Sequence, residues 1–244
     1  MTDRDGDGSG AAREREKRDP AATRRALLRA AEELFSARGF DGVPIEDIAL
    51  RAGVNKALIS YHFRGKRGLY SAVLESAFGE MAARVESIAA GAGDAAEALH
   101  GVVGAFAAVA RERPGFPTLF VREVLATGIE PAVVPYLVRI VAVSRRLAER
   151  GIREGLFRRV DPLLLHFAIV GSLVFFFSTD EARRRAVADG LIPFAMPGTT
   201  EFVRFVEETI LRGLAPPRRP RGSRLSPSRR RVRPPSTRRK GARA

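Results

Sequence analysis

One stretch of the chain decides its fold: Ile45-Glu-Asp-Ile-Ala-Leu-Arg-Ala-Gly53-Val-Asn-Lys-Ala-Leu-Ile-Ser-Tyr-His-Phe63-Arg-Gly-Lys66. Two short helical patterns meet here at a tight turn, which Gly53 permits. The apolar positions on the two sides of this turn are Ile48, Ala49, Ala52, Val54, Ile59 and Phe63. Two helices that cross around so small an apolar cluster form a helix-turn-helix, and its second helix can enter a DNA major groove.

The charges around this stretch favour a polyphosphate partner. No acidic residue occurs between Asp47 and Glu75. The basic residues in that interval are Arg51, Lys56, Arg64, Lys66 and Arg67. We therefore expect a surface without carboxylates, which phosphate binding requires.

The charge of the whole chain is uneven. The net charge of the 244 residues is +14, yet residues 71–214 together carry about −1. Residues 215–244 hold twelve Arg or Lys and no acid. This division predicts a nucleic-acid reader joined to a nearly neutral sensor of something else.

Several classes of protein are excluded by composition. There is no Cys, and the three His at positions 62, 100 and 166 are too scattered for a metal cluster. We find no nucleophile–base pair and no phosphate loop, so we expect no enzyme, no metal and no cofactor. The N-terminus has no signal-like apolar stretch, and the apolar run Leu163 to Phe177 is short for a membrane span. It predicts a buried helix of a cytoplasmic protein.

Start and stop signals divide the rest of the chain into helices. Asp19-Pro20 opens one that Gly39 ends, and Asp161-Pro162 opens another that reaches Ser178. Further helices are expected over residues 66–90, 94–113, 118–126, 131–155, 180–189 and 201–214, the last capped by Thr199 or Thr200. No strand pattern is present, so the predicted fold is all-α. Residues 1–18 and the Arg/Pro/Ser-rich residues 215–244 are expected to be disordered arms.

The run from Thr23 to Leu74 resembles the N-terminal domain of the TetR/AcrR family of bacterial transcriptional regulators. The matching pieces are Ala30-Ala-Glu-Glu-Leu-Phe35, Arg38-Gly-Phe40, Asp47-Ile-Ala49, Arg51-Ala-Gly-Val54, Tyr61-His-Phe63 and Lys66 to Leu69. In this order the combination is highly specific, although it covers only about a fifth of the chain.

Candidate DNA contacts lie at the start of the second helix of the motif. Asn55 is placed to cap it, so that Lys56 can donate to guanine and Ala57 and Leu58 can meet a thymine methyl. The resemblance implies base or backbone contacts at Lys56, Ala57, Leu58, Ser60, Tyr61 and His62. For Tyr61 the alternative is packing against the next helix, and for His62 it is filling the helix end.

Lys66 opens the following long helix, where its ammonium and the free backbone N–H groups can hold a phosphate. The resemblance implies the same role, and the alternative is a solvated lysine. Two positions depart from the family pattern. Pro44 stands where a capping Thr or Ser is common, and Ser60 stands where Tyr is common. Both departures bear on which DNA sequence is read.

The middle of the chain offers weaker candidates for a ligand site. Aromatic residues there can line a cavity, although at helical spacing they are more often plain core. The candidates are Phe106, Phe120 and Phe167, with Arg122 and His166 as polar anchors. For both anchors the alternative is a hydrogen-bonded core or interface residue.

We therefore expect an N-terminal helix-turn-helix domain at 19–65 and a larger effector-binding and dimerisation domain at 66–214. The resemblance implies a homodimeric transcriptional regulator, most simply a repressor, with double-stranded DNA and a small, mostly apolar effector as partners. The dimer would use the helices at 163–178 and 201–214. The alternative is a non-specific DNA-binding protein that depends on the basic tail.

Overall fold

The computed structural model describes residues 19–125 and 128–217, which contain ten helices and no strand. The helices are α2 (Pro20–Arg38), α3 (Ile45–Ala52), α4 (Ala57–Phe63), α5 (Lys66–Gly91), α6 (Ala95–Glu112), α7 (Phe116–Leu125), α8 (Val134–Arg153), α9 (Pro162–Ser178), α10 (Asp180–Ala188) and α11 (Thr199–Leu214). The predicted all-α fold is confirmed. The disordered segment predicted at residues 1–18 and the tail from residue 218 onward lie outside the described residues.

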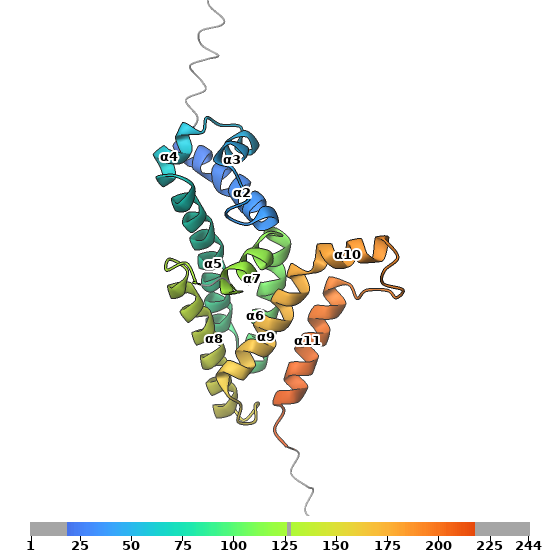
Figure 1. Cartoon of the computed structure of the whole chain (residues 1–244). Coiled ribbons are helices and arrows are strands. Elements are labelled where there is room, and N and C mark those ends of the chain that lie inside the picture. Colours follow the sequence, from blue (N-terminus) through green and yellow to red (C-terminus); the bar gives the residue numbers. More distant parts are fainter. Residues whose placement is uncertain (1–18, 126–127, 218–244) are drawn as a thin grey trace, which may run out of the picture.

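The N-terminal domain is built on α2, whose ends follow the sequence signals. The Asp19 carboxylate accepts a hydrogen bond from the Ala21 N–H at 2.9 Å, and Gly39 ends the helix with φ of 74°. One face of α2 buries Leu27 and Phe35 against α3 and the first turns of α5. Figure 1 shows α2, α3 and α4 as a separate cap at the top of the molecule.

The larger C-terminal domain is a bundle in which α5 is central. This helix begins in the cap and runs down the body, where it packs against α6 and α8 (Figure 1). The helix α9 crosses the front of this layer and contacts α6, α7, α8 and α11. Because α5 packs against both domains, movements of the body can reach the cap through it.

Most predicted helix ends are confirmed, with four corrections, and the first is that α7 begins at Phe116 and not at residue 118. The Asp94 and Asp161 carboxylates accept backbone N–H groups of α6 and α9 as predicted. The helix expected from Pro131 begins at Val134, because residues 131–133 form a turn and Pro135 then lies in the first helical turn. At α11 the capping position is Gly198, without a side-chain hydrogen bond, so the predicted threonine cap is wrong. The helix α5 also includes Gly91, which was expected to break it.

No single helix in the described residues is long and apolar enough to cross a membrane. The apolar helix α9 reaches the necessary length only together with α10, and that pair is bent by 45°.

Candidate nucleic-acid interface

A left-handed residue makes the turn between α3 and α4. Gly53 has φ of 67°, a conformation that costs L-residues with a side chain about 1–2 kcal/mol. Its N–H donates to the Leu50 carbonyl at 3.1 Å, and the Val54 N–H donates to the Ala49 carbonyl at 3.0 Å. These bonds close the end of α3 and turn the chain into α4. At the other end of α3, Pro44 provides no side-chain cap, as its residue type implies.

The start of α4 follows the prediction for Asn55. Its side-chain oxygen accepts a hydrogen bond from the Ala57 N–H at 2.9 Å. Lys56 already has helical dihedral angles, φ −55° and ψ −29°. Lys56, Ala57 and Leu58 therefore form the first turn, which is the part of a recognition helix that meets base edges.

Burial separates the faces of α4. Ile59 and Phe63 point inward, with 0% and 6% exposure. Lys56, Ala57, Ser60 and Tyr61 are exposed, whereas Leu58 and His62 are partly buried. Tyr61 is 78% exposed and meets only the His62 ring among the aromatic rings, at 5.0 Å between centroids in the described part of the chain. Packing of Tyr61 against the next helix is therefore not observed.

The expected surface without carboxylates is wrong. Three basic residues of this interval form ion pairs with acids from other segments. Lys56 Nζ lies 3.3 Å from Glu46, and Arg51 lies 2.8 Å from Glu33. Arg67 lies 2.8 Å from Glu130. A segment that contains no acidic residue can still lie next to acidic residues from other parts of the chain. Near Lys56, a backbone hydrogen bond and the lysine ammonium lower the pKa of the Glu46 carboxyl. Glu46 therefore stays charged and competes with DNA for Lys56.

Lys66 packs against an aromatic ring, so it is not the fully solvated lysine of the alternative. Its Nζ lies 4.6 Å from the centroid of the Phe40 ring, a cation–π contact, and the side chain is partly buried. Gly65 precedes α5 with φ of 107° and gives no side-chain cap, so Lys66 remains beside an uncapped helix N-terminus. The contact with Phe40 fixes the lysine at this position.

Arg64 is a feature that the sequence did not single out. It is the only non-glycine residue with positive φ in the described ranges, at 59°, and it links α4 to α5. Its N–H donates to the Ser60 carbonyl at 3.0 Å. This left-handed conformation ends α4, a position that glycine usually occupies, and it costs a residue with a side chain about 1–2 kcal/mol. The exposed Arg64 guanidinium is thereby placed beside the end of α4.

A buried polar cluster connects the start of α5 to α7, and no pattern in the chain indicates it. Glu123 of α7 is only 3% exposed and accepts a hydrogen bond from the Tyr70 hydroxyl at 3.0 Å. Glu123 also accepts the backbone N–H of Glu130, whose own carboxylate binds Arg67 and Ser71 of α5. Burial, and next the charge of Glu123, raise the pKa of Tyr70 far above its ordinary range. Tyr70 is therefore a permanent donor to Glu123.

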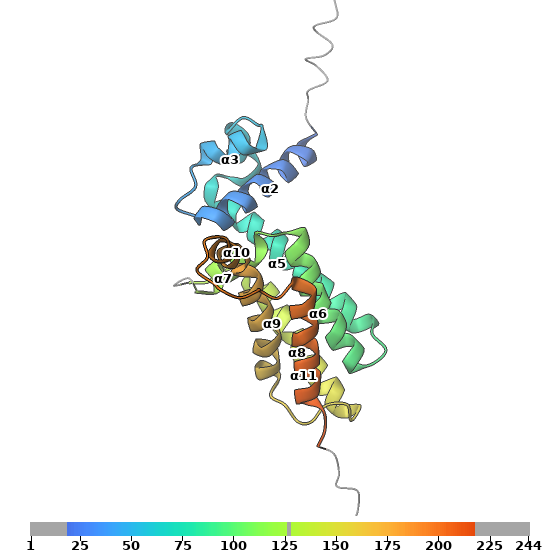
Figure 2. The same cartoon turned by 90° about the vertical axis from the view of Figure 1, so that its right-hand side faces the viewer.

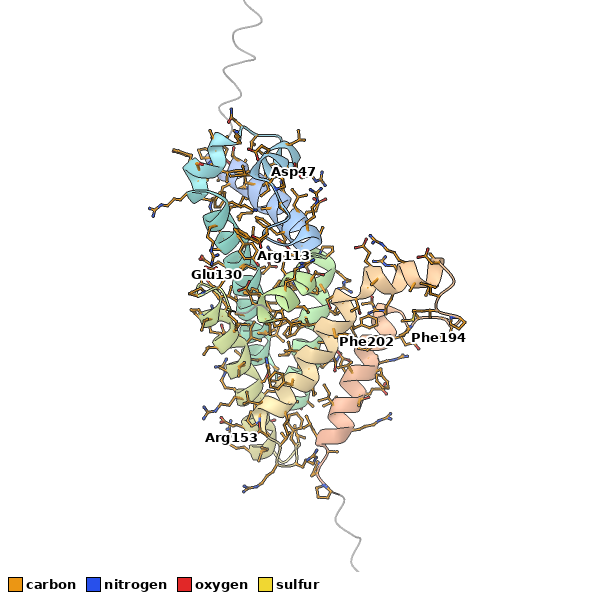
Figure 3. All side chains as sticks on the ribbon, in the orientation of Figure 1. Asp47, Arg113, Glu130, Arg153, Phe194 and Phe202 are labelled. Carbon is orange, nitrogen blue, oxygen red and sulfur yellow. The ribbon has the colours of Figure 1, made fainter. Side chains whose placement is uncertain are left out.

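Tyr70 also contacts the N-terminal domain through its ring. It packs edge-on against Phe35 and Phe40, each at 5.1 Å between centroids. A second link is made by Arg113 at the end of α6, which forms ion pairs with Glu32 of α2 and Glu80 of α5. Figure 3 shows Arg113 and Glu130 at the level where the cap meets the body. The domains are thus joined by the Tyr70 ring, which a buried polar cluster holds in place, and by the Arg113–Glu32 ion pair.

The ligand candidates divide into buried and exposed groups. Phe106, Phe120 and His166 are buried, with 4%, 8% and 8% exposure. Phe167 is 67% exposed, and Arg122 is exposed and lies beside Gly39 of the N-terminal domain. The prediction that these two residues belong to an apolar interior is wrong. The α9 sequence is apolar all round, so its pattern could not identify the inner face, and α7 buries Glu123 in place of Arg122.

His166 has the hydrogen-bonded core position that was its alternative reading. Its Nδ1 lies 3.1 Å from the Ser144 hydroxyl, and burial lowers the pKa of the imidazole. The space beside Phe106, also lined by Met81, Phe116 and Leu173, is about 10 Å³. That is at the lower limit for one water molecule. No effector fits there without movement of the surrounding helices.

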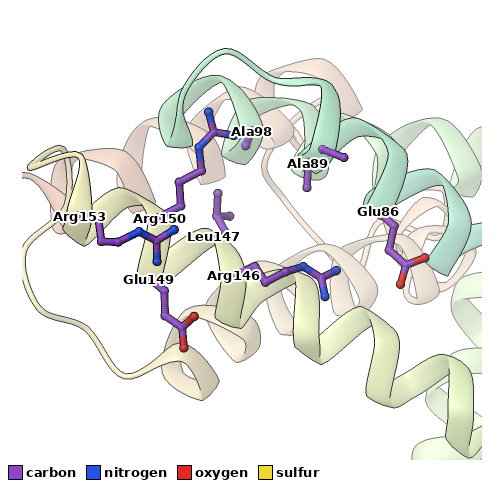
Figure 4. A pocket seen from close by; sticks show the side chains of 9 residues that line it. Glu86, Ala89, Ala98, Arg146, Leu147, Glu149, Arg150 and Arg153 are labelled. Carbon is purple, nitrogen blue, oxygen red and sulfur yellow. The ribbon is translucent and has the colours of Figure 1, made fainter.

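Larger depressions also open on the surface of the described residues, and two of them are lined by charged side chains. One, of about 490 Å³, lies between the end of α5, the start of α6 and α8, with Arg146, Arg150 and Arg153 along one side (Figure 4). Arg150 is held by the Ala92 and Gly93 carbonyls and by Glu154. The other, of about 930 Å³, lies where α2 meets α6, α7 and α10. It includes Arg122 and the Arg113–Glu32 pair, so it borders the junction of the domains.

Residues 27–73 match the family model of bacterial regulatory proteins, tetR family. The chain is 28% identical over 199 residues to the HTH-type transcriptional repressor NicS of Pseudomonas putida, covering 79% of this chain and 92% of that protein. It is also 28% identical over 196 residues to the HTH-type transcriptional regulator RutR of Escherichia coli K12, covering 71% and 92%. The fold is similar to that of the TetR family transcriptional regulator PfmR of Thermus thermophilus, with TM-score 0.61, 24% identity, and 78% and 99% of the two chains covered.

These similarities agree with the geometry of the site. The family match spans α3, the Gly53 turn and α4, which are the elements that form the exposed recognition face. The matches to NicS and RutR extend through the C-terminal domain. Residues 27–73 thus form a DNA-binding domain of the TetR type, and the chain as a whole is similar to transcriptional regulators that carry this domain.

Proposed function

We propose that this protein is a cytoplasmic homodimeric repressor that leaves a palindromic DNA site when a small molecule binds its C-terminal domain. The observation that supports the proposal best is the two-sided character of α4. Ile59 and Phe63 anchor the helix, while Lys56, Ala57, Ser60 and Tyr61 lie exposed on its outer side. The similarity to a repressor, NicS, favours repression over activation.

In this proposal Lys56 reads bases and Lys66 holds a phosphate. Lys56 would exchange Glu46 for a guanine, so part of its binding energy is spent on breaking an ion pair. Ala57 and Leu58 would contact a thymine methyl, and Ser60, Tyr61 and His62 would contact base edges or the backbone. Lys66, fixed on the Phe40 ring, would meet a phosphate together with the N–H groups of the α5 N-terminus.

The face formed by α9 and α11 is suited to a second copy of the chain. Leu164 and Phe167 of α9 and Phe205 of α11 are 67%, 67% and 64% exposed. On the outer side of α11 the charges alternate, in the order Glu201, Arg204, Glu208 and Arg212. A surface that is apolar at its centre and carries both signs at its edge can pair with itself about a two-fold axis.

The proposed effector is small and mostly apolar, and it would act through α7. Phe116 and Phe120 of this helix pack on Phe78 of α5 at 5.3 Å and 5.2 Å between centroids. The same helix carries Glu123, which binds Tyr70 beside the N-terminal domain. An apolar molecule that widens the space beside Phe106 and Phe116 would displace α7 and, with it, the start of α5. This couples the two sites through one helix.

The two lysines provide the test of the proposal. On a binding site selected from random DNA, Lys66→Ala should weaken binding to the selected and a scrambled sequence by a similar factor, about tenfold or more. Lys56→Ala should in addition reduce the preference for the selected sequence about tenfold. Arg153→Ala, an exposed cation at the far end of the molecule (Figure 3), is the matched control and should bind normally.

Binding titrations of all four proteins decide the outcome. A loss confined to the selected sequence in Lys66→Ala would contradict its phosphate role. Equal affinity of the unaltered protein for selected and scrambled DNA would favour the alternative, non-specific binding through the basic tail.

A further inference from the structure

One segment of the described chain leaves several large apolar side chains exposed to solvent. It consists of α10 and the following loop, residues 180–198, and we call it the arm. No residue of α10 is buried. Val187, Leu191 and Phe194 are 41%, 75% and 65% exposed. Figure 1 shows the arm projecting sideways from the body, past α11, and Figure 3 shows Phe194 at its outer end.

The arm is nevertheless held in a defined direction. The Arg183 guanidinium stacks over the Phe176 ring at 4.1 Å and donates to the Phe176 carbonyl at 2.5 Å. Asp180 pairs with Arg184, and Glu181 pairs with Arg185, each one turn apart. At the end of α10, the Leu191 N–H donates to the Ala186 carbonyl at 2.9 Å. A nine-residue helix is marginal without packing, so these contacts stabilise an arm on which Val187, Leu191 and Phe194 remain exposed.

One apolar surface near the base of the arm, the Phe176 ring, is already covered. Phe202, at the start of α11, stacks on Phe176 at 3.8 Å with the rings 5° from parallel. The arm therefore cannot cover Leu191 and Phe194 by folding back onto this part of α9. Its apolar residues need a surface that another molecule provides.

The orientation of the arm indicates that this other molecule is a second copy of the chain. A dimer that places two α4 helices on one palindromic DNA has its two-fold axis directed toward the DNA, which is upward in Figure 1. Rotation about that axis keeps every residue at its own height. The arm leaves the upper end of α9, and in Figure 2 α10 lies in front of α9 and points toward the viewer. At that height the second subunit presents the upper end of its own α9, where Phe175 is 70% exposed.

We propose that the arm of each subunit packs on the α9 helix of a second copy of this chain, with Phe194 and Leu191 near the second copy's Phe175. The inference rests on the proposed dimer and adds a contact outside the α9/α11 face. No Asp, Glu, Lys or Arg occurs between Pro162 and Ser178, so this surface is covered without desolvating a charge. The arm itself contains three acids and three arginines, which gives no net repulsion between subunits.

The exposed area agrees with what a stable dimer needs. Phe167, Phe175, Phe194 and Phe205 are each 64–70% exposed. At about 200 Å² per phenylalanine they present on the order of 500 Å² of apolar surface. The exposed leucines of α9 and the arm add to this, and a stable interface buries about 800 Å² on each partner. Without the arm, Phe194 and Leu191 would be lost from this total.

The absence of cysteine from the chain makes the proposal directly testable. Subunits carrying Phe194→Cys are mixed and re-equilibrated with subunits carrying Phe175→Cys, and a short bismaleimide is added. Each chain then has one thiol, so every Phe194–Phe175 crosslink joins two subunits. The control replaces Phe175→Cys by Val138→Cys, an exposed apolar site of α8 on the opposite side of the body. Light scattering of each single variant reports its oligomeric state.

The expected result is a crosslinked heterodimer for the Phe194–Phe175 pair and at least tenfold less product for the Phe194–Val138 pair. In addition, Phe194→Ser should raise the dimer dissociation constant about tenfold without changing the melting temperature of the monomer. A dimer without the crosslink, and with an unchanged dissociation constant for Phe194→Ser, overturns the arm contact and leaves the proposed dimer intact. A monomeric unaltered protein overturns both proposals.

Discussion

The helix-turn-helix and the α9–arm region differ in how their residues find their place. In α4 the buried face agrees with the sequence pattern: Ile59 and Phe63 are buried, and Ser60 and Tyr61 between them are exposed. In α9 almost every position is apolar, yet Leu165 is 2% exposed and Phe167 is 67% exposed. When one side of a helix is polar, the sequence pattern identifies the opposite side as the buried face. A helix that is apolar all round leaves that decision to its neighbours.

This difference shows that a functional surface can be predicted from the sequence when contacts between residues close in the chain form it. The DNA-reading face depends on contacts within about twenty residues, such as the Asn55 cap and the Gly53 turn. The dimer and effector faces depend on helices distant in sequence, such as α11 covering one side of α9. Three predictions test this contrast, beginning with the largest expected effect.

The first compares a glycine required by its left-handed backbone conformation with one required by the close approach of two consecutive helices, α4 and α5. A Cβ at Gly68 would lie 1.8 Å from the Phe63 carbonyl oxygen, so Gly68→Ala must force α5 away from α4. We expect a loss of about 4 kcal/mol in the free energy of unfolding, or no folded protein. Gly53→Ala meets no atom within 4 Å and should cost only about 1–2 kcal/mol, through its positive φ.

Gly104→Ala is the control for the substitution itself. It lies inside α6, also with no atom within 4 Å, and should leave stability unchanged or raise it by up to about 1 kcal/mol. Urea unfolding measures all three variants. Equal losses for Gly68→Ala and Gly53→Ala would mean that the α4–α5 contact does not constrain the fold in this way.

The second prediction concerns the outer face of α9 and α11. Phe205→Glu places a carboxylate among the apolar side chains of the proposed dimer face, so dimerisation would have to bury a charge. We expect the dimer dissociation constant to rise at least about a hundredfold, which corresponds to about 2.7 kcal/mol. Binding to a palindromic site should fall with it, because a monomer engages only one half-site.

Val138→Glu is the matched control, since Val138 is 62% exposed on α8, away from this face. Sedimentation or light scattering over a concentration series gives both constants. If the two variants dimerise equally well, the interface lies on a different surface, and the apolar outer face of α9 needs another explanation.

The third and smallest effect belongs to the junction between the domains. Tyr70→Phe removes the hydroxyl that donates to the buried Glu123 while keeping the ring between Phe35 and Phe40. A buried carboxylate that loses a donor should cost about 1–3 kcal/mol of stability. Because the link to α7 is weakened, the affinity for DNA should change as well, although Tyr70 is not part of the reading face.

A change in DNA affinity without any change in dimerisation would support the junction as a coupling element. The control is Tyr136→Phe, a tyrosine of α8 beside Gly79, which should leave DNA affinity unchanged. Unaltered stability and affinity in Tyr70→Phe would show that the Glu123 cluster does not connect the domains energetically.

The sequence by itself determined the local parts of this protein. It predicted the helix-turn-helix, the caps at Asp19, Asn55 and Asp161, and the all-α fold, because turns, caps and amphipathic faces are made by residues close in the chain. It failed where distant segments meet. The basic residues between Asp47 and Glu75 form ion pairs with acids from outside that interval, namely Glu33, Glu46 and Glu130.

Only the tertiary structure decided which side chains face each other across the domains. It buried Glu123 and exposed its neighbour Arg122, two charged residues that no periodic pattern distinguishes. It placed Lys66 on Phe40, exposed Phe167, and left Leu191 and Phe194 of the arm exposed. The physical reason is that burial of an apolar or paired charged group depends on which helix packs over it, and that choice is made by the whole bundle.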